Sequence, residues 1–190
     1  MDRGMDARAR TASPVDPLLP TPGAGFEQPF EMLQACHERV HRMLRLLSRL
    51  REHLSAHGAD EQAQQAARDV MRYFDQAAPE HHRDEELHVF PALLAQGDPD
   101  IVAIVKRLQH DHLQMESRWA GARQVLAGIA AGDLDSLAPQ AQSALDAFAA
   151  PYERHIDAEE QIAYPAAAVL LQGAPLAEMS RDMMARRGLR

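Results

Sequence analysis

Two stretches of the sequence, residues 81–91 and 155–165, carry the same pattern of residue types. Each reads His-x3-Glu-Glu-x3-aromatic-Pro. A further pair, His37 and His112, lies upstream, and its members are separated by almost the same interval as the two motifs. A long, nearly constant offset indicates that one structural unit occurs twice. We therefore expect two similar halves, each with one histidine segment followed by one His-x3-Glu segment.

Glycines and prolines divide the chain into segments. Within each segment the apolar residues recur at spacings of three and four, which is typical of helices with one buried face. They predict helices over residues 29–57, 60–91, 98–132, and from Asp133 or Ser136 to about residue 173. Pro79 is expected to bend or break the second of these helices, and Pro91 to end it. No segment has the pattern of a strand. Long helices with short connections favour an all-α, antiparallel up-down-up-down four-helix bundle.

The two ends of the chain differ from this bundle segment, which we place at residues 29–172. Residues 1–28 are rich in proline and glycine and have no apolar period, so they predict a disordered, flexible arm. Residues 173–190 predict a basic tail with one short helix, whose apolar side would carry Leu176 and Met179 together with Met183.

Composition and charge argue against several classes of function. The chain has 28 acidic and 20 basic residues, and the resulting net charge of −8 opposes binding to nucleic acid or to an anionic membrane. No apolar run is long enough for a membrane span or a signal peptide. The single cysteine, Cys36, cannot form an internal disulfide, so we expect a cytoplasmic protein with a buried, inert thiol.

The repeated histidines and glutamates predict a metal centre. Residues four apart on a helix lie on one face, so each His-x3-Glu pair can bind adjacent metals or bridge two of them. Imidazole and carboxylate ligands suit iron, manganese or zinc, and two bridging carboxylates suit a pair of metals. The middles of four antiparallel helices can converge on one point. The candidate ligands there are His37, His81, Glu85, His112, His155 and Glu159.

The alternative interpretation is that these are ordinary polar residues on solvated faces, but that predicts no relation between the two halves. Three residues adjoin the candidate ligands along the chain. His82 is one residue out of register with His81 and is expected to face away from the site. Glu86 and Glu160 repeat faithfully and are expected beside the ligands or in salt bridges.

With these segments, residues 30–172 resemble the hemerythrin-like domains, also called HHE cation-binding domains. The resemblance implies a four-helix bundle that holds two iron ions joined by a bridging oxygen. It also implies that His37 and His112 are terminal ligands and that Glu85 and Glu159 bridge the metals, with the remaining two histidines completing the set.

One position departs from the pattern of oxygen-carrying hemerythrins. Their pattern has a further histidine four residues after the one that matches His112. This chain has Glu116 at that position. The repeat partner of Glu116 is His41, at the same offset that relates His112 to His37. Either side chain is a candidate seventh ligand. A carboxylate stabilises higher oxidation states better than an imidazole does, which argues against reversible oxygen carriage.

The sequence thus predicts a protein that holds two iron ions, or manganese or zinc, and that binds or senses a small diatomic or peroxidic ligand such as oxygen, nitric oxide or hydrogen peroxide. The bundle is expected to restrict access and to exclude charged organic substrates. The alternatives are a di-iron enzyme of the peroxidase or oxidase type, which Glu116 would favour, an iron-storage or repair protein, and a purely structural bundle.

Overall fold

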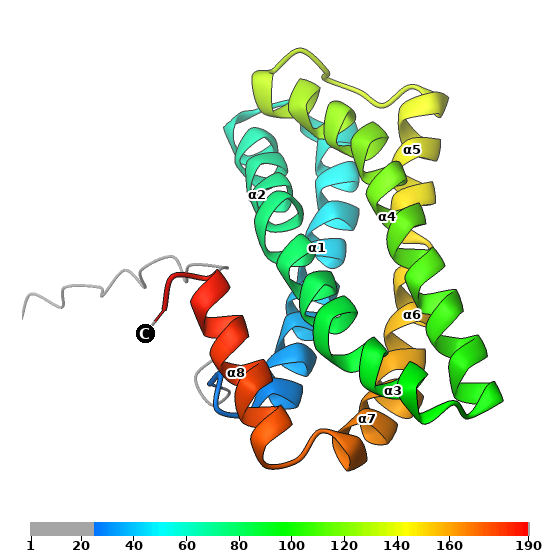
Figure 1. Ribbon diagram of the computed structural model, residues 1–190. Coiled ribbons are helices and arrows are strands. Elements are labelled where there is room, and N and C mark those ends of the chain that lie inside the picture. The colour runs from blue at the N-terminus through cyan, green and yellow to red at the C-terminus, as the bar shows by residue number, and fades with distance from the viewer. Residues whose placement is uncertain (1–24, 190) are drawn as a thin grey trace, which may run out of the picture.

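The computed structural model describes residues 25–189, and every regular element in that range is helical. The elements are α1 (Pro29–His57), α2 (Glu61–Asp84), the π-helical turn η1 (Glu85–Val89), α3 (Phe90–Gln96), α4 (Pro99–Ala131), α5 (Pro139–Ala149), α6 (Tyr152–Ala158), the π-helical turn η2 (Glu159–Ala163), α7 (Tyr164–Leu170) and α8 (Ala174–Arg186). They build four antiparallel rods: α1, α2–η1–α3, α4, and α5–α6–η2–α7 (Figure 1). The predicted all-α bundle is confirmed.

Local chemistry explains several helix ends. The side chain of Asp60 accepts the N–H of Ala63 at 2.8 Å and caps α2. Asp98 caps α4 in the same way, ahead of Pro99, whose missing N–H costs nothing in the first turn. At the other end of α4, Gly132 has a φ of 78°, a left-handed conformation that glycine adopts without strain. These ends agree with the sequence prediction.

The start of the last rod differs from the prediction. α5 begins at Pro139, so neither Asp133 nor Ser136 is its N-cap. The nearby side chain of Asp135 instead accepts the N–H of Ala59 at 3.1 Å. This bond connects the loop between α1 and α2 with the loop between α4 and α5, both at the upper end of the bundle in Figure 1. The polar residues of this loop therefore connect two loops and do not open a helix.

The prolines break the rods less than the sequence predicts. α2 continues through Pro79 without a break. The second rod does not end at Pro91, because α3 carries it on to Gln96. Pro151 does divide its rod, since it separates α5 from α6. A proline removes one helical hydrogen bond, but packing against neighbouring helices offsets that loss in a bundle.

The two halves share one irregularity at the same repeat position. In η1 the N–H of Phe90 donates to the carbonyl of Glu85, and in η2 the N–H of Tyr164 donates to the carbonyl of Glu159. Each bond reaches one residue further back than an α-helical bond and widens the helix. Such π turns within α-helices are uncommon and occur frequently at functional sites. The sequence repeat is therefore also a backbone repeat, and both wide turns begin at a glutamate of the repeated motif.

The apolar core consists of two clusters with a polar layer between them. One cluster fills the end of the bundle at which the α1–α2 and α4–α5 loops lie, and it includes Leu54, Leu126 and Phe148. The other cluster lies towards α3, α7 and α8 and includes Leu93 and Leu108. On the first three rods, the predicted metal ligands come between the residues of one cluster and those of the other, and on the last rod His155 and Glu159 flank the point where one cluster gives way to the other. Burial of apolar residues on both sides therefore fixes the position of this layer.

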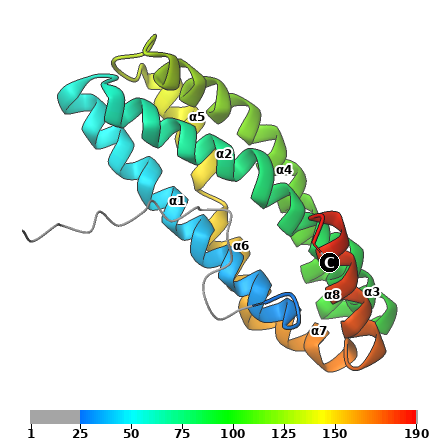
Figure 2. The ribbon, with the colours of Figure 1, turned by 90° about the vertical axis from the view of Figure 1, so that its left-hand side faces the viewer.

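The C-terminal helix α8 packs alongside α1 and the end of α2 (Figures 1 and 2). Met179 and Met183 are fully buried in the second cluster, as their spacing predicts. Most of the predicted arm, residues 1–24, lies outside the described residues. Phe26, close behind them, is buried in the same cluster, with the guanidinium of Arg187 5.4 Å from its ring centre. Ordered packing therefore begins before α1.

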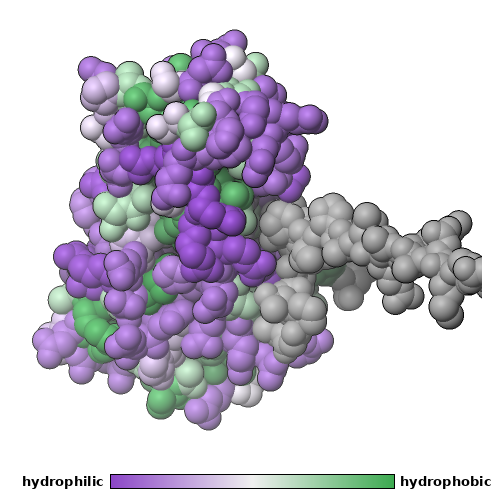
Figure 3. All heavy atoms as spheres, turned by 180° about the vertical axis from the view of Figure 1, so that it is seen from behind, coloured by the Kyte–Doolittle hydropathy of each residue, from purple (hydrophilic) through white to green (hydrophobic). Residues whose placement is uncertain are grey.

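The molecular surface is mainly polar. On the face seen from behind Figure 1, hydrophilic side chains dominate and hydrophobic ones are scattered (Figure 3). Among the described helices, none has the length and apolar character needed to cross a bilayer.

Candidate metal centre

The structure brings all six predicted ligands together in the polar layer. All six side chains are buried, and both glutamates are 0% exposed. Four helical rods contribute to the layer, so it forms only when the whole bundle is assembled. The contributing residues are His37 of α1, His81 and Glu85 of the second rod, His112 of α4, and His155 and Glu159 of the last rod.

The donor atoms form two groups, in each of which all donor atoms lie within 4.8 Å of one another. Metal–ligand bonds of this kind measure about 2.0–2.2 Å, so opposite ligand atoms around one ion are roughly 4.4 Å apart. Each group therefore has the size that one ion requires. The first group consists of His37, His81, Glu85 and Glu159, and the second consists of His82, His112 and His155.

The carboxylate of Glu159 lies between these two groups. Its Oε2 atom is 3.1 Å from Nε2 of His37 in the first group. Its Oε1 atom is 3.0 Å from Nε2 of His155 and 3.7 Å from Nε2 of His112, both in the second group. One oxygen thus faces each group.

The carboxylate of Glu85 repeats this arrangement. Its Oε1 atom is 3.4 Å from Nε2 of His81, and its Oε2 atom is 3.4 Å from Nε2 of His112. The hydroxyl of Tyr164 donates a hydrogen bond to Oε1 and also lies 3.2 Å from Nε2 of His37. Glu85 therefore has one protein donor, which Glu159 lacks.

Several buried polar atoms of this layer have no hydrogen-bond partner, which indicates that the residues fit a pair of metal ions. Oε2 of Glu85 and both carboxylate oxygens of Glu159 are buried without a hydrogen-bond partner. Leaving a buried polar atom unpaired costs about 1–3 kcal/mol, so such atoms are rare. In addition, Nε2 of His112 lies 3.2 Å from Nε2 of His155, so two nitrogens that ligate metals point at one space. Bound cations would satisfy all of these atoms.

The two glutamates have opposite electrostatic environments in the metal-free chain. Burial raises the pKa of Glu85 well above its ordinary value, and the nearby charge of Glu159 adds to this effect. Burial acts in the same direction on Glu159, but the charge of His155 and the closeness of the imidazoles of His37 and His112 outweigh it and hold the pKa of Glu159 well below its ordinary value. Two negatively charged carboxylates this close repel each other unless cations lie between them.

The histidines differ in the same way. Burial lowers the pKa of His81 well below its ordinary value, and the charge of His37 lowers it further. Burial also opposes the charge on His37, but the nearby carboxylates of Glu159 and Glu160 outweigh it and raise the pKa of His37. A neutral imidazole is the form that binds a metal, so the low pKa of His81 suits a ligand.

Two further glutamates orient the histidines of α1 and α4, as the repeat led us to expect. Nδ1 of His37 lies 2.8 Å from the carboxylate of Glu160, and Nδ1 of His112 lies 3.0 Å from that of Glu86. A histidine that ligates a metal through Nε2 commonly donates its Nδ1–H to such a carboxylate, which fixes the ring orientation and makes the ligand nitrogen more basic. Each half of the site therefore has the same supporting contact.

The expectation that His82 faces away from the site is wrong. Its ring stacks on that of His112, with centroids 4.0 Å apart and planes 14° apart. The second rod lies between α1 and α4, so His81 turns towards His37 while the next residue turns towards α4. The repeat comparison missed His82 because its partner position holds Ile156, which binds no metal.

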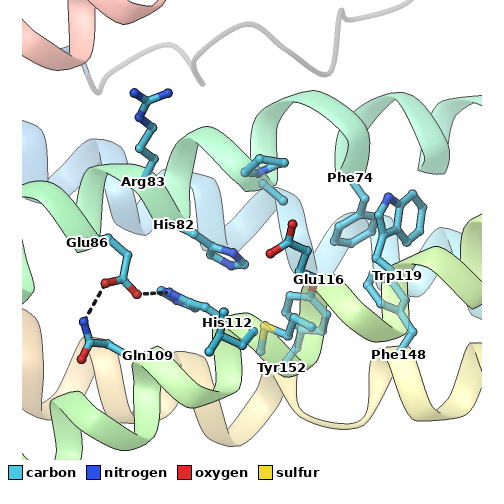
Figure 4. Close-up of a pocket in the computed structure, with 14 residues that line it drawn as sticks. Phe74, His82, Arg83, Glu86, Gln109, His112, Glu116, Trp119, Phe148 and Tyr152 are labelled. Carbon is cyan, nitrogen blue, oxygen red and sulfur yellow. Dashed lines mark hydrogen bonds and ion pairs between the residues drawn. The ribbon is translucent and has the colours of Figure 1, made fainter.

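The two candidates for a seventh ligand, Glu116 and His41, belong to neither group of donor atoms. Glu116 is exposed and points into a side cavity that also reaches His82 (Figure 4). His41 is half-buried, one turn beyond His37 on α1. The seventh side chain that the structure brings to the site is His82.

Comparison with known proteins agrees with this geometry. Residues 28–167 match the family described as the hemerythrin HHE cation binding domain, and this range contains every residue of both donor groups. A Haemophilus influenzae protein named "Uncharacterized protein" is 31% identical over 170 residues, which are 90% of this chain and 96% of that protein. Because the family match covers most of the chain, the protein belongs to the hemerythrin HHE cation-binding domain family.

Proposed function

We propose that the protein holds two iron ions in the polar layer and reversibly binds a small ligand there, such as oxygen, nitric oxide or hydrogen peroxide. Cation binding follows from the family, whereas the metal, the number of ions and the ligand are our proposal. The observation that carries it is the orientation of Glu85 and Glu159, each of which directs one oxygen to each donor group. Two bridging carboxylates are suited to a pair of ions.

The side chains would divide between two positions. The first would use His37 and His81, and the second would use the histidines of the other donor group. Glu85 and Glu159 would join the two positions, while Glu160 and Glu86 hold two ligand rings in place. Iron bound in this way would supply two redox-active ions with room for an exogenous ligand. Five imidazole nitrogens and four carboxylate oxygens fill fewer places than two six-coordinate ions offer.

The burial of the two donor groups favours the second position as the place of ligand entry. Every member of the first group is buried, whereas His82 in the second group is half-buried and borders the side cavity. Apolar clusters on both sides of the layer exclude bulk water, which suits reversible binding of a small ligand. A cytoplasmic site of action is part of this proposal, in keeping with the single buried cysteine.

As a metal ligand, Glu116 would favour the alternative of a peroxidase or oxidase. That side chain is exposed and belongs to neither donor group. Glu116 therefore gives no support to an enzyme, and reversible ligand binding is the function that the site supports best.

The test is to load the protein with ferrous iron without oxygen, remove unbound iron, and record visible spectra during titration with air, azide and nitric oxide. We expect saturable bands that disappear when the ligand is removed. The Glu159→Gln variant should lose most of the response, and Glu153→Gln, which changes an exposed glutamate outside the site, should keep it. The proposal would be refuted if the wild-type protein retained no iron, or if its visible spectrum did not change with any of the three ligands.

A further inference from the structure

A cavity of about 660 Å³ opens beside the second donor group, between α2, α4 and the α5–α6 segment. His82 and His112 line one end of it (Figure 4). Phe74, Trp119 and Phe148 line the other end. This volume lies within the usual range for pockets that bind small organic molecules and far exceeds what a diatomic ligand needs. The cavity therefore leaves room for an organic ligand on this side, although the sequence led us to expect that charged organic substrates are excluded.

The apolar end of the cavity is unusually aromatic for this chain. Of nine aromatic residues in the sequence, four line the cavity, Tyr152 being the fourth. The ring of Phe74 lies 4.9 Å from that of Phe148 and 5.3 Å from that of Trp119. These rings meet at tilted and edge-to-face angles, and Trp119, which is half-buried where Phe74 and Phe148 are buried, is the ring on which a flat guest can stack. An aromatic ring is the guest that this end fits best.

A carboxylate lies between the two ends. Glu116 points into the cavity, whereas the side chain of Arg83 points away from it (Figure 4). Glu86, the other acidic group of the lining, is already bonded to His112 and Gln109. Within residues 25–189, Glu116 itself makes no ion pair or side-chain hydrogen bond. An uncompensated carboxylate next to aromatic rings favours a cation.

We propose that this cavity binds a small aromatic amine, with the ring against Phe74, Trp119 and Phe148 and the ammonium group at Glu116. The assignment rests on the proposed function in one respect, which is that it places the organic ligand beside the second metal position. The cavity itself consists of protein side chains only. Binding can therefore be measured with and without metal.

Trp119 is the only tryptophan of the chain, so its fluorescence reports on this cavity alone. Benzylammonium, benzyl alcohol and benzoate share one ring and a similar size but differ in charge. We expect saturable changes in Trp119 emission in the metal-free protein, with benzylammonium binding most tightly and benzoate most weakly. Linear quenching that is equal for all three, or tighter binding of the alcohol or the anion, would overturn the assignment.

The Glu116→Gln variant tests the role of charge. It should reduce the preference for benzylammonium over benzyl alcohol by about threefold, the size expected for an exposed ion pair, while binding of the alcohol is kept. Glu153→Gln is the control and should leave the preference unchanged. An unchanged preference in Glu116→Gln would contradict the proposal.

Repeating the titration with iron-loaded protein separates the two proposals. Protein that holds iron and binds none of the three probes refutes the cavity assignment alone. Protein that binds benzylammonium when metal-free but never retains iron refutes the proposed function and leaves the cavity assignment standing. If both hold, saturation with benzylammonium should also shift the visible bands of the bound iron, and unshifted bands would contradict the placement beside the second position.

Discussion

The ring of Tyr164 lies parallel to the ring of His37, with centroids 5.5 Å apart and planes 8° apart. In the other half of the repeat, Phe90 stacks on His112 with a centroid distance of 5.6 Å and an angle of 26°. The repeat therefore extends to the rings that pack against the candidate ligands. The difference between the halves is the hydroxyl of Tyr164, which donates to Glu85.

The Tyr164→Phe variant makes the two halves alike and should show what this hydroxyl does. We expect the metal-free protein to lose about 1 kcal/mol of unfolding free energy, the usual net value of one hydrogen bond. The iron-loaded variant should keep its metal but show shifted visible bands, because Glu85 loses its donor. Tyr152→Phe is the control, since that buried hydroxyl lies outside both donor groups. Equal spectra for Tyr164→Phe and wild type would contradict this role.

His82→Ala tests the side chain that the sequence predicts to face away from the site. Removing it takes one of three histidines from the second donor group and leaves the first group intact. We expect iron content measured after desalting to fall from about two ions per chain to about one. His88→Ala is the matched control, because His88 lies on the same rod but binds Asp182 of α8. A full complement of iron in His82→Ala would show that His82 is not a ligand.

The sequence predicts the bundle and the six residues that meet in the polar layer, for identifiable reasons. Aspartates such as Asp60 and Asp98 cap helices through contacts within three residues, so the local sequence is sufficient. The candidate ligands can be predicted because the same residues occur twice, and a repeat removes much of the ambiguity of single histidines.

The errors arose where packing between rods decides the outcome. His82 turns to the site because its rod lies between two others, which no pattern along one helix shows. The rod continues past Pro91 because η1 and its neighbours offset the lost hydrogen bond. The side cavity is also invisible in sequence, since Glu116 and Trp119 meet residues of other rods there.

A buried carboxylate connects α8 to the rod that carries Glu85. The side chain of Asp84 is 1% exposed and binds both Arg186 and Arg187, the latter at 2.7 Å. Asp84→Asn removes the negative charge that faces both guanidinium groups, while Arg186 keeps Glu80 and Asp182, so we expect a loss of roughly 2–3 kcal/mol of unfolding free energy.

Urea denaturation of Asp84→Asn and Asp146→Asn gives the matched comparison. Asp146 pairs with Arg51 at the surface, with 62% of its side chain exposed, so its loss should cost less than about 1 kcal/mol. Limited proteolysis should also release α8 from Asp84→Asn first. Similar losses of stability in the two variants would argue against a buried role for Asp84.

Tyrosine ionisation gives a prediction of pH dependence. Burial raises the pKa of both Tyr73 and Tyr152 above the ordinary value near 10. The unfolded chain ionises first, so the stability these phenols contribute is complete below pH 10 and is lost as the pH rises further.

The measurement uses metal-free Tyr164→Phe, which leaves Tyr73 and Tyr152 as the only tyrosines. Tyrosinate absorbance should stay flat as the pH is raised and should then increase together with the loss of helical circular dichroism. A gradual rise centred near pH 10 in a protein that is still helical would show that these hydroxyls are accessible.

The proposed function requires that Glu85 and Glu159 join two metal positions into one centre. It is tested most directly by electron paramagnetic resonance of the oxidised, iron-loaded protein together with its iron content. We expect about two iron ions per chain and almost no signal from isolated ferric iron, because bridging ligands couple the two spins. A strong signal from isolated ferric iron, or one ion per chain, would contradict it.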